Sequence, residues 1–250
     1  MIAAVLRVAL WIGVIDGLAG VAGLGFLYTP ESNLPMLVLS ALLVLLAAAL
    51  LLLSSTSGAV ALVQRIAPWK ALGAGVRRLP LVLVVIGVVG LVCGAAGWFE
   101  SWWMARAGQV DAAAIVAGNV TNTRPLHTAV HWLVVIVQWI VVPSWLATAL
   151  AWIAAYERRD VLGLKWLASG LHWRILLVTA AAVAVLVWLP WRFVYWRPRA
   201  LPASSVEMVF IVAKLAVIYL LSQIAWAIVL ATAARRVAAP TALPVTAPPG

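Results

Sequence analysis

Asp16 is an acidic residue in the middle of a long apolar stretch near the start of the chain. An ionised carboxylate at the centre of a bilayer is costly unless it is paired or hydrated. One interpretation is structural: Asp16 is paired, or it is protonated and hydrogen-bonded to a neighbour such as Gln138 or Gln223. The other interpretation is that Asp16 couples a proton or an ion to transport. The sequence leaves both open and favours the structural one.

Lys214 lies in the last apolar stretch and is a cation that could pair with Asp16. A helical side chain leans toward the N-terminus of its own helix, which carries the Lys214 ammonium group away from the midplane. That geometry does not favour an ion pair with Asp16. Snorkelling of Lys214 to the outer headgroups stays equally open.

Two histidines, His127 and His131, are four residues apart and therefore share one face of a helix. This spacing can chelate a metal, and Glu100 or Asp111 in the preceding segment could supply a further ligand. Histidines at a membrane boundary also serve as interfacial hydrogen-bonding groups. The pattern allows a metal site at His127, His131 and Glu100, and it favours the interfacial interpretation.

The segment WLPWRFVYWRPR, over residues 188–199, interleaves arginines with aromatic residues. Guanidinium groups suit bidentate contacts with phosphate and stack on aromatic rings. The candidates for binding an anionic lipid headgroup or a lipid-linked phosphate are Arg192, Trp196, Arg197 and Arg199. The alternative, which we favour, is an aromatic belt whose arginines anchor a helix at the interface.

These residues must be positioned by membrane-spanning helices. Hydrophobic residues make up 66% of the chain and charged residues 10%, with a mean hydropathy of +1.12, whereas a soluble domain is about half apolar and a quarter charged. A hydrocarbon core of roughly 30 Å needs about 20 apolar residues per helix. We therefore predict an all-α, polytopic transmembrane bundle over residues 1–237, with six spans near 6–28, 36–60, 80–99, 127–154, 175–189 and 207–232.

The remaining segments are short. The longest connection, around 101–126, is expected to be a loop, which is too short for a separate soluble domain. The tail, 238–250, holds four prolines and no charged residue. We expect this tail to be disordered.

The net charge of +10 could indicate a nucleic-acid partner, but the basic residues are scattered among the connections and do not form one face. Most of them fall on segments that a cytoplasmic N-terminus places inside, so the positive-inside rule predicts both termini in the cytoplasm. The preference for Arg over Lys, with abundant Ala, Val and Leu, is typical of a GC-rich bacterial genome. The predicted location is a bacterial inner (plasma) membrane, with multiple passes and no nucleic-acid partner.

Glycines recur at helical spacing in two predicted spans. They are Gly13, Gly17 and Gly20 in the first span and Gly87, Gly90, Gly94 and Gly97 in the third. Small residues let helix backbones approach each other in lipid. We expect these two helices at the centre of the bundle, and we favour packing within the chain over a dimer interface. Pro143 predicts a kink in the fourth span.

Three functions remain open. The chain contains no G-x-S-x-G, H-E-x-x-H, D-x-x-x-D or P-loop motif, so the sequence leans against an enzyme and implies no cofactor. The first function is a non-catalytic accessory or scaffolding component that packs against a membrane protein partner or a second copy of the chain.

The second function is a small transporter or lipid-handling protein that uses Asp16, Lys214 and the arginine cluster around Arg192, with an anionic lipid as partner. The third is a membrane enzyme that acts on a lipid phosphate through the two histidines and Glu100. We prefer them in that order.

Overall fold

The computed structural model describes residues 2–30, 33–118, 123–156, 161, 164–194 and 205–238, apart from the side chains of Arg124 and of residues 205–207. The statements below concern this part of the chain. Its helices, in chain order, are α1 (Ile2–Tyr28), α2 (Leu34–Gln64), the 3-10 turn η1 (Pro68–Ala71), α3 (Leu72–Val116), α4 (Arg124–Ile136), the π-helical η2 (Val137–Val141), α5 (Val142–Ala155), α7 (Lys165–Gly170), α8 (Trp173–Ala182), the π-helical η3 (Val183–Trp188), α9 (Leu189–Val194) and α10 (Ser205–Ala238).

The two ends of α2 show how the sequence sets helix boundaries. The Asn33 side chain accepts a hydrogen bond of 3.1 Å from the Met36 N–H, and Pro35 occupies the first turn, where an N–H would have no partner within the helix. At the other end, Arg65 adopts a left-handed conformation with φ of 56°, and its N–H bonds to the Ala61 carbonyl. The left-handed residue ends the helix.

Six helical stretches within the described chain are long and apolar enough to cross a membrane. They cover Ile2–Tyr28, Leu34–Gln64, Pro68–Val116, Pro125–Ala155, Trp173–Val194 and Met208–Ala238. The described residues contain no strand, because a helix satisfies its own backbone groups in lipid. The prediction of an all-α, polytopic protein with six spans is confirmed. The cytoplasmic position of both termini stays a prediction.

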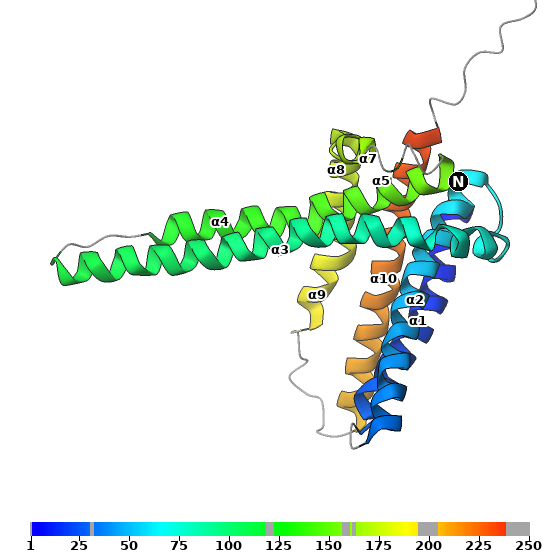
Figure 1. Cartoon of the computed structure of the whole chain (residues 1–250), viewed down its shortest axis with the longest axis horizontal. Helices are drawn as coiled ribbons and strands as arrows, with labels where there is room; N and C mark the ends of the chain where they lie inside the picture. Colours follow the sequence, from blue (N-terminus) through cyan, green and yellow to red (C-terminus); the bar gives the residue numbers. More distant parts are fainter. Residues whose placement is uncertain are drawn as a thin grey trace, which may run out of the picture.

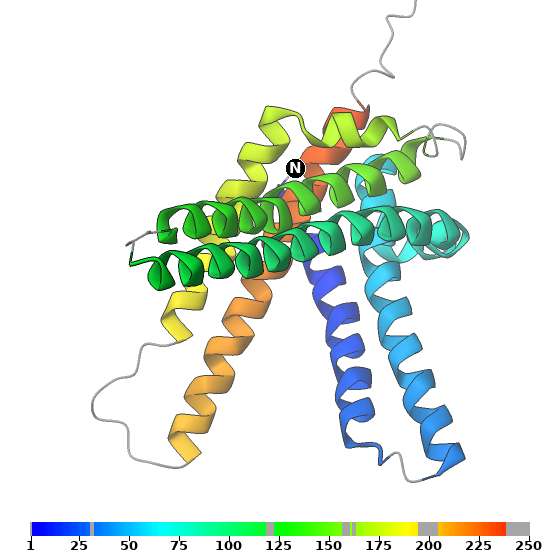
Figure 2. The same cartoon turned by 60° about the vertical axis from the view of Figure 1, so that its left-hand side comes forward.

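The helices form three arms that separate from a common end, which we call the junction. The first arm is the α1–α2 hairpin, the second is the long α3–α4 hairpin, and the third is α9 with the first half of α10. Figure 1 shows the second arm pointing away from the other two. Figure 2 shows the first and third arms diverging below the junction like two legs.

Buried side chains gather at the junction. It comprises the start of α1, the last parts of α2 and α10, and α5 with α7. The side chains of Ile12, Leu150, Trp166 and Leu230 are at most 1% exposed there. Along the arms, by contrast, only 6% of the most apolar stretch of α2 and of α10 is buried. The protein therefore has a packed core at one end and arms with open apolar faces.

The second arm corrects the prediction of a loop around 101–126. α3 continues to Val116 and has 45 residues, a length of about 67 Å at 1.5 Å per residue. That is more than twice the hydrocarbon core of roughly 30 Å. Residues 104–116, MARAGQVDAAAIV, are too polar for a span but rich in residues with high helix propensity, so the helix goes on after the apolar stretch ends.

The prediction that α1 and α3 form the centre of the bundle is wrong. α1 packs against α2 and α10 instead, and a Cβ at Gly13 would lie 3.6 Å from Gln223 of α10. α3 contacts α2 near its own start, where a Cβ at Gly75 would lie 3.4 Å from Ser57, and it then runs beside α5 and α4. The kink predicted at Pro143 stays a prediction; the structure places η2, a π-helical turn, just before it in the fourth span, ending at Val141.

Candidate functional site

Asp16 lies on the face of α1 that meets α2. Its Oδ1 atom accepts a hydrogen bond of 2.5 Å from the hydroxyl of Ser54, a fully buried residue of α2. The hydrogen bond supplies one of the partners that a carboxyl group inside an apolar bundle requires. Asp16 is thus engaged with a neighbouring helix.

Three further hydrogen bonds join the same helices and α10. The Trp11 indole donates to Ser57 at 2.8 Å, the Trp226 indole donates to Ser55 at 3.1 Å, and the Tyr219 hydroxyl donates to the Gly13 carbonyl at 2.5 Å. We call Asp16, Ser54 and these residues the polar cluster. Each bond contributes a net stabilisation of about 0.5–1.5 kcal/mol, so the cluster holds α1, α2 and α10 in register.

The sequence analysis missed the serines of the polar cluster, although a signal was present. Residues 54–57, SSTS, are four consecutive hydroxyl residues inside an apolar stretch. A buried hydroxyl group needs a partner, and the next span back offers Asp16. Of the two glutamines predicted as neighbours of Asp16, Gln223 faces α1 beside Gly13, whereas Gln138 is exposed on η2.

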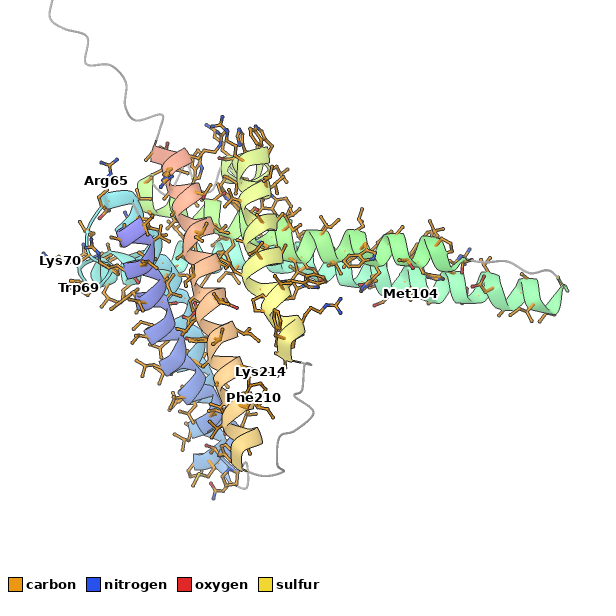
Figure 3. All side chains as sticks on the ribbon, turned by 180° about the vertical axis from the view of Figure 1, so that it is seen from behind. Arg65, Trp69, Lys70, Met104, Phe210 and Lys214 are labelled. Atoms are coloured by element: carbon orange, nitrogen blue, oxygen red, sulfur yellow. The ribbon has the colours of Figure 1, made fainter. Side chains whose placement is uncertain are left out.

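Lys214 faces a different neighbour from Asp16. Its Nζ atom lies 3.4 Å from the carbonyl oxygen of Val194 at the end of α9 and 4.3 Å from the ring centre of Phe210. Figure 3 shows Phe210 and Lys214 together on α10. The described residues contain no ion pair between Lys214 and Asp16, so the structure does not bring these two candidates into one site.

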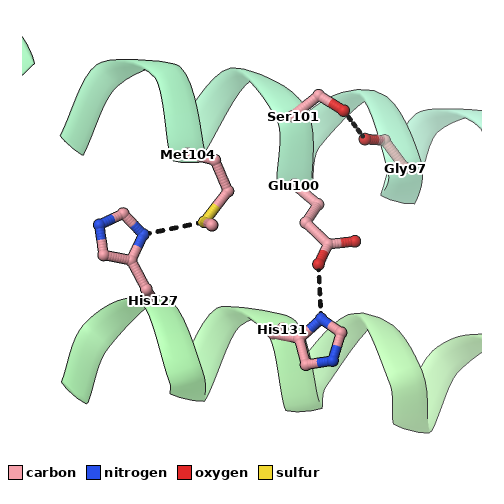
Figure 4. Close-up of polar contacts among 6 residues, drawn as sticks. All are labelled: Gly97, Glu100, Ser101, Met104, His127 and His131. Atoms are coloured by element: carbon pink, nitrogen blue, oxygen red, sulfur yellow. Dashed lines mark hydrogen bonds and ion pairs between the residues drawn. The ribbon is translucent and has the colours of Figure 1, made fainter. Parts of the chain in front are cut away.

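The two histidines of the second arm face different partners on α3. His131 Nδ1 lies 2.8 Å from Glu100 Oε1, and His127 Nδ1 lies 2.9 Å from the sulfur of Met104 (Figure 4). The side chains of His131 and Glu100 are 60% and 27% exposed. Within the described ranges, no three His, Cys, Asp or Glu residues are grouped to hold a metal ion. The contacts instead join α3 to α4.

The arginine cluster is described in part. Arg192 follows Trp188 by one helical turn, and its guanidinium group lies over the Trp188 ring, 4.7 Å from the ring centre. This stacking is the interaction expected of an arginine in an aromatic belt. Trp196, Arg197 and Arg199 lie outside the described residues, and a headgroup site at this cluster stays a prediction.

The fold and these contacts define a multi-pass α-helical membrane protein in which polar side chains of neighbouring helices pair with one another. Comparison with family models, with curated proteins and with solved structures finds no match for the chain.

Proposed function

We propose that the chain is a non-catalytic accessory component of a bacterial inner-membrane complex and that α3 receives a transmembrane helix of a partner protein. One observation carries the proposal. A Cβ atom at any of four α3 glycines would meet no atom within 4 Å outside the backbone of its own helix, and these residues are Gly87, Gly90, Gly94 and Gly97. Glycines at this spacing form a shallow groove in which a second helix can approach closely.

We call these four glycines of α3 the glycine stripe. The residues around the glycine stripe support a helix as its occupant. Only 17% of the most apolar stretch of Pro68–Val116 is buried, and Leu91, beside the stripe, is 76% exposed. Helix association in lipid depends on close van der Waals packing, and a glycine groove allows that packing along several turns. α3 thus offers both the groove and the flanking apolar side chains.

The transporter and enzyme alternatives receive less support. Asp16 is hydrogen-bonded to Ser54 and does not pair with Lys214. The two histidines contact different α3 residues, and only one of them meets Glu100. In the described structure, Asp16 and the two histidines form contacts between helices. Such contacts fit a protein without a catalytic or transport site.

The test is native mass spectrometry of the gently extracted full-length chain and of the variant Gly90→Leu/Gly94→Leu. We expect the unmodified chain to retain a protein subunit and the variant to lose it, because two leucine side chains fill the groove. Retention of the subunit by the variant would overturn the proposal. A second copy of the chain in place of another protein would contradict the partner that we propose.

Two control variants separate docking from folding. Gly108→Leu also enters open space on α3, beyond the stripe, and should keep the subunit. Gly58→Leu should unfold the first arm, because even a Cβ there would lie 3.1 Å from Val8 and 3.3 Å from Ile12. Loss of the subunit supports the proposal only when the thermal midpoint of the stripe variant equals that of the unmodified chain.

A further inference from the structure

A cavity of about 720 Å³ lies at the junction, where the start of α1 meets the ends of α2 and α10. Three arginines line it: Arg7, Arg65 and Arg235. No Asp or Glu is among its lining residues within the described chain. The volume is within the usual range for small-molecule sites, roughly 300–1,000 Å³. Three arginine residues around one space, with no carboxylate among the described lining residues, favour an anionic ligand.

The walls of this arginine cavity belong to the packed core. Val8, Ala61 and Ala234 line it and are 2%, 3% and 4% exposed, so the wall is formed by well-packed side chains. Ala4 and Val5, in the first turn of α1, also line it. The first N–H groups of a helix have no partner within the helix and give that end a positive partial charge. The C-terminal ends of α2 and α10 carry a negative partial charge of about half an elementary charge each. The three positive charges of the arginines outweigh these two partial charges.

Arg65 occupies a backbone position that disfavours it. Its φ of 56° and ψ of 36° are left-handed, a conformation in which the Cβ of an L-residue is crowded and for which glycine is the usual choice at a helix end. An arginine here lowers stability relative to glycine, yet it adds a basic residue to the lining of the cavity. The positive-inside bias would place basic residues on this side, but it would not gather residues 7, 65 and 235 around one space.

We propose that the arginine cavity binds a phosphate group through Arg7, Arg65 and Arg235. The planar guanidinium donates two parallel hydrogen bonds to phosphate oxygens, which makes arginine well suited to this ligand. Figure 3 shows Arg65 at the end of α2, near Trp69 and Lys70 of η1. Trp69 is 57% exposed, as an aromatic residue at a membrane interface would be. An anionic phospholipid headgroup is therefore the expected source of the phosphate, and free phosphate is the other source.

The test measures binding to the purified full-length chain in a zwitterionic detergent, by calorimetry. The probes are short-chain phosphatidylglycerol, short-chain phosphatidylcholine and inorganic phosphate. We expect phosphatidylglycerol to bind and phosphatidylcholine not to bind. Arg7→Gln and Arg235→Gln should each weaken binding about tenfold, because each removes a charge-assisted hydrogen-bonding group. Equal binding of inorganic phosphate, with the same dependence on the arginines, would identify free phosphate as the ligand.

Arg106→Gln is the matched control, because it removes an exposed arginine from the second arm and leaves the cavity unchanged. Equal binding of both phospholipids, or equal loss of binding in Arg106→Gln and in the cavity variants, would overturn the proposal. Binding that persists unchanged in Arg7→Gln and Arg235→Gln would overturn it as well.

Arg65→Gly separates binding from folding. Glycine accepts the left-handed conformation, so this variant should unfold at a higher temperature than the unmodified chain while it binds phosphatidylglycerol about tenfold more weakly. Unweakened binding in Arg65→Gly would remove Arg65 from the site and contradict the proposal. The measurement is independent of the glycine stripe, since Gly90→Leu/Gly94→Leu should bind phosphatidylglycerol like the unmodified chain.

Discussion

Ser54 donates a 2.5 Å hydrogen bond to Asp16, and this contact joins the two helices of the first arm. The serine is fully buried, and its hydroxyl group would lose a strong partner if Asp16 were removed. The relationship favours the structural interpretation of Asp16. It also gives a direct way to measure how much the carboxyl group contributes to stability.

Replacing Ser54 with alanine should destabilise the first arm. We expect Ser54→Ala to lower the free energy of unfolding by about 1–3 kcal/mol, because it leaves a partly buried acceptor without its donor. Asp16→Asn keeps an acceptor oxygen in place, so it should lower the free energy of unfolding less than Asp16→Ala does. Unfolding in mixed detergent micelles, followed by tryptophan fluorescence, measures each value. Ser101→Ala is the control, because the Ser101 hydroxyl is exposed and, among the described residues, bonds to the Gly97 carbonyl of its own helix. Equal effects of Ser54→Ala and Ser101→Ala would contradict this account.

Gly170→Ala should disrupt the contact between α7 and α5. A Cβ at Gly170 would lie 2.7 Å from Trp145 Cδ1 and 3.1 Å from its Cα, and the Cα cannot move away without shifting the helix. We expect a loss of about 1–3 kcal/mol in the free energy of unfolding. Gly73→Ala enters open space within α3 and should instead stabilise the chain by about 0.5–1 kcal/mol. Destabilisation by both variants would argue against the close approach of α7 and α5.

The contact between Glu100 and His131 should affect the stability of the second arm only near these two residues. Both side chains are partly exposed, and an exposed pair contributes at most about 1 kcal/mol. We expect His131→Ala to leave the thermal midpoint nearly unchanged and to speed hydrogen exchange in the first turns of α4. Zinc should not raise the midpoint. A zinc-dependent rise that His127→Ala or His131→Ala abolishes would establish the metal site that the spacing of the histidines allows.

The pKa of His172 should respond to nearby arginines. Desolvation first, and then the positive charges of Arg236 and Arg174, lower this pKa below its usual range. The unfolded chain then takes up a proton more readily, so the free energy of unfolding should fall as the pH drops below about 6.5 and through the lowered pKa. Protonation also removes the acceptor Nδ1, which bonds to the Arg174 N–H at 3.3 Å and caps α8.

A proton NMR titration of labelled histidine measures the effect. Arg236→Gln should raise the pKa of His172, because one positive charge is lost, whereas Arg106→Gln on the distant second arm should leave it unchanged. An unaltered titration in Arg236→Gln would show that Arg236 does not act on His172.

The number of spans was predictable from sequence because each apolar stretch is long enough for a bilayer and is interrupted by polar residues or proline. The contact between Asp16 and Ser54 could have been predicted from the sequence, because two polar groups in consecutive apolar spans each need a partner. The directions of the arms were not predictable, because hydropathy reports the length of a helix and not the helix it packs against. The extension of α3 to Val116 was not predicted, because Arg106, Gln109 and Asp111 interrupt the apolar stretch and a criterion for membrane spans stops at such residues.

Tyr219 and Gly13 are 206 positions apart in the chain, and their contact therefore depends on the order of synthesis. At about 5–20 residues per second, a ribosome needs on the order of 10–40 s between these two residues. Ser54 follows Asp16 by only 38 positions, so the first hairpin can enter the membrane with its carboxyl group already bonded. Tyr219, which bonds to Gly13 of α1, is synthesised only with α10, the last helix. A nascent chain that stops before α10 would leave the Gly13 carbonyl without the Tyr219 hydroxyl and the α10-facing surface of α1 uncovered.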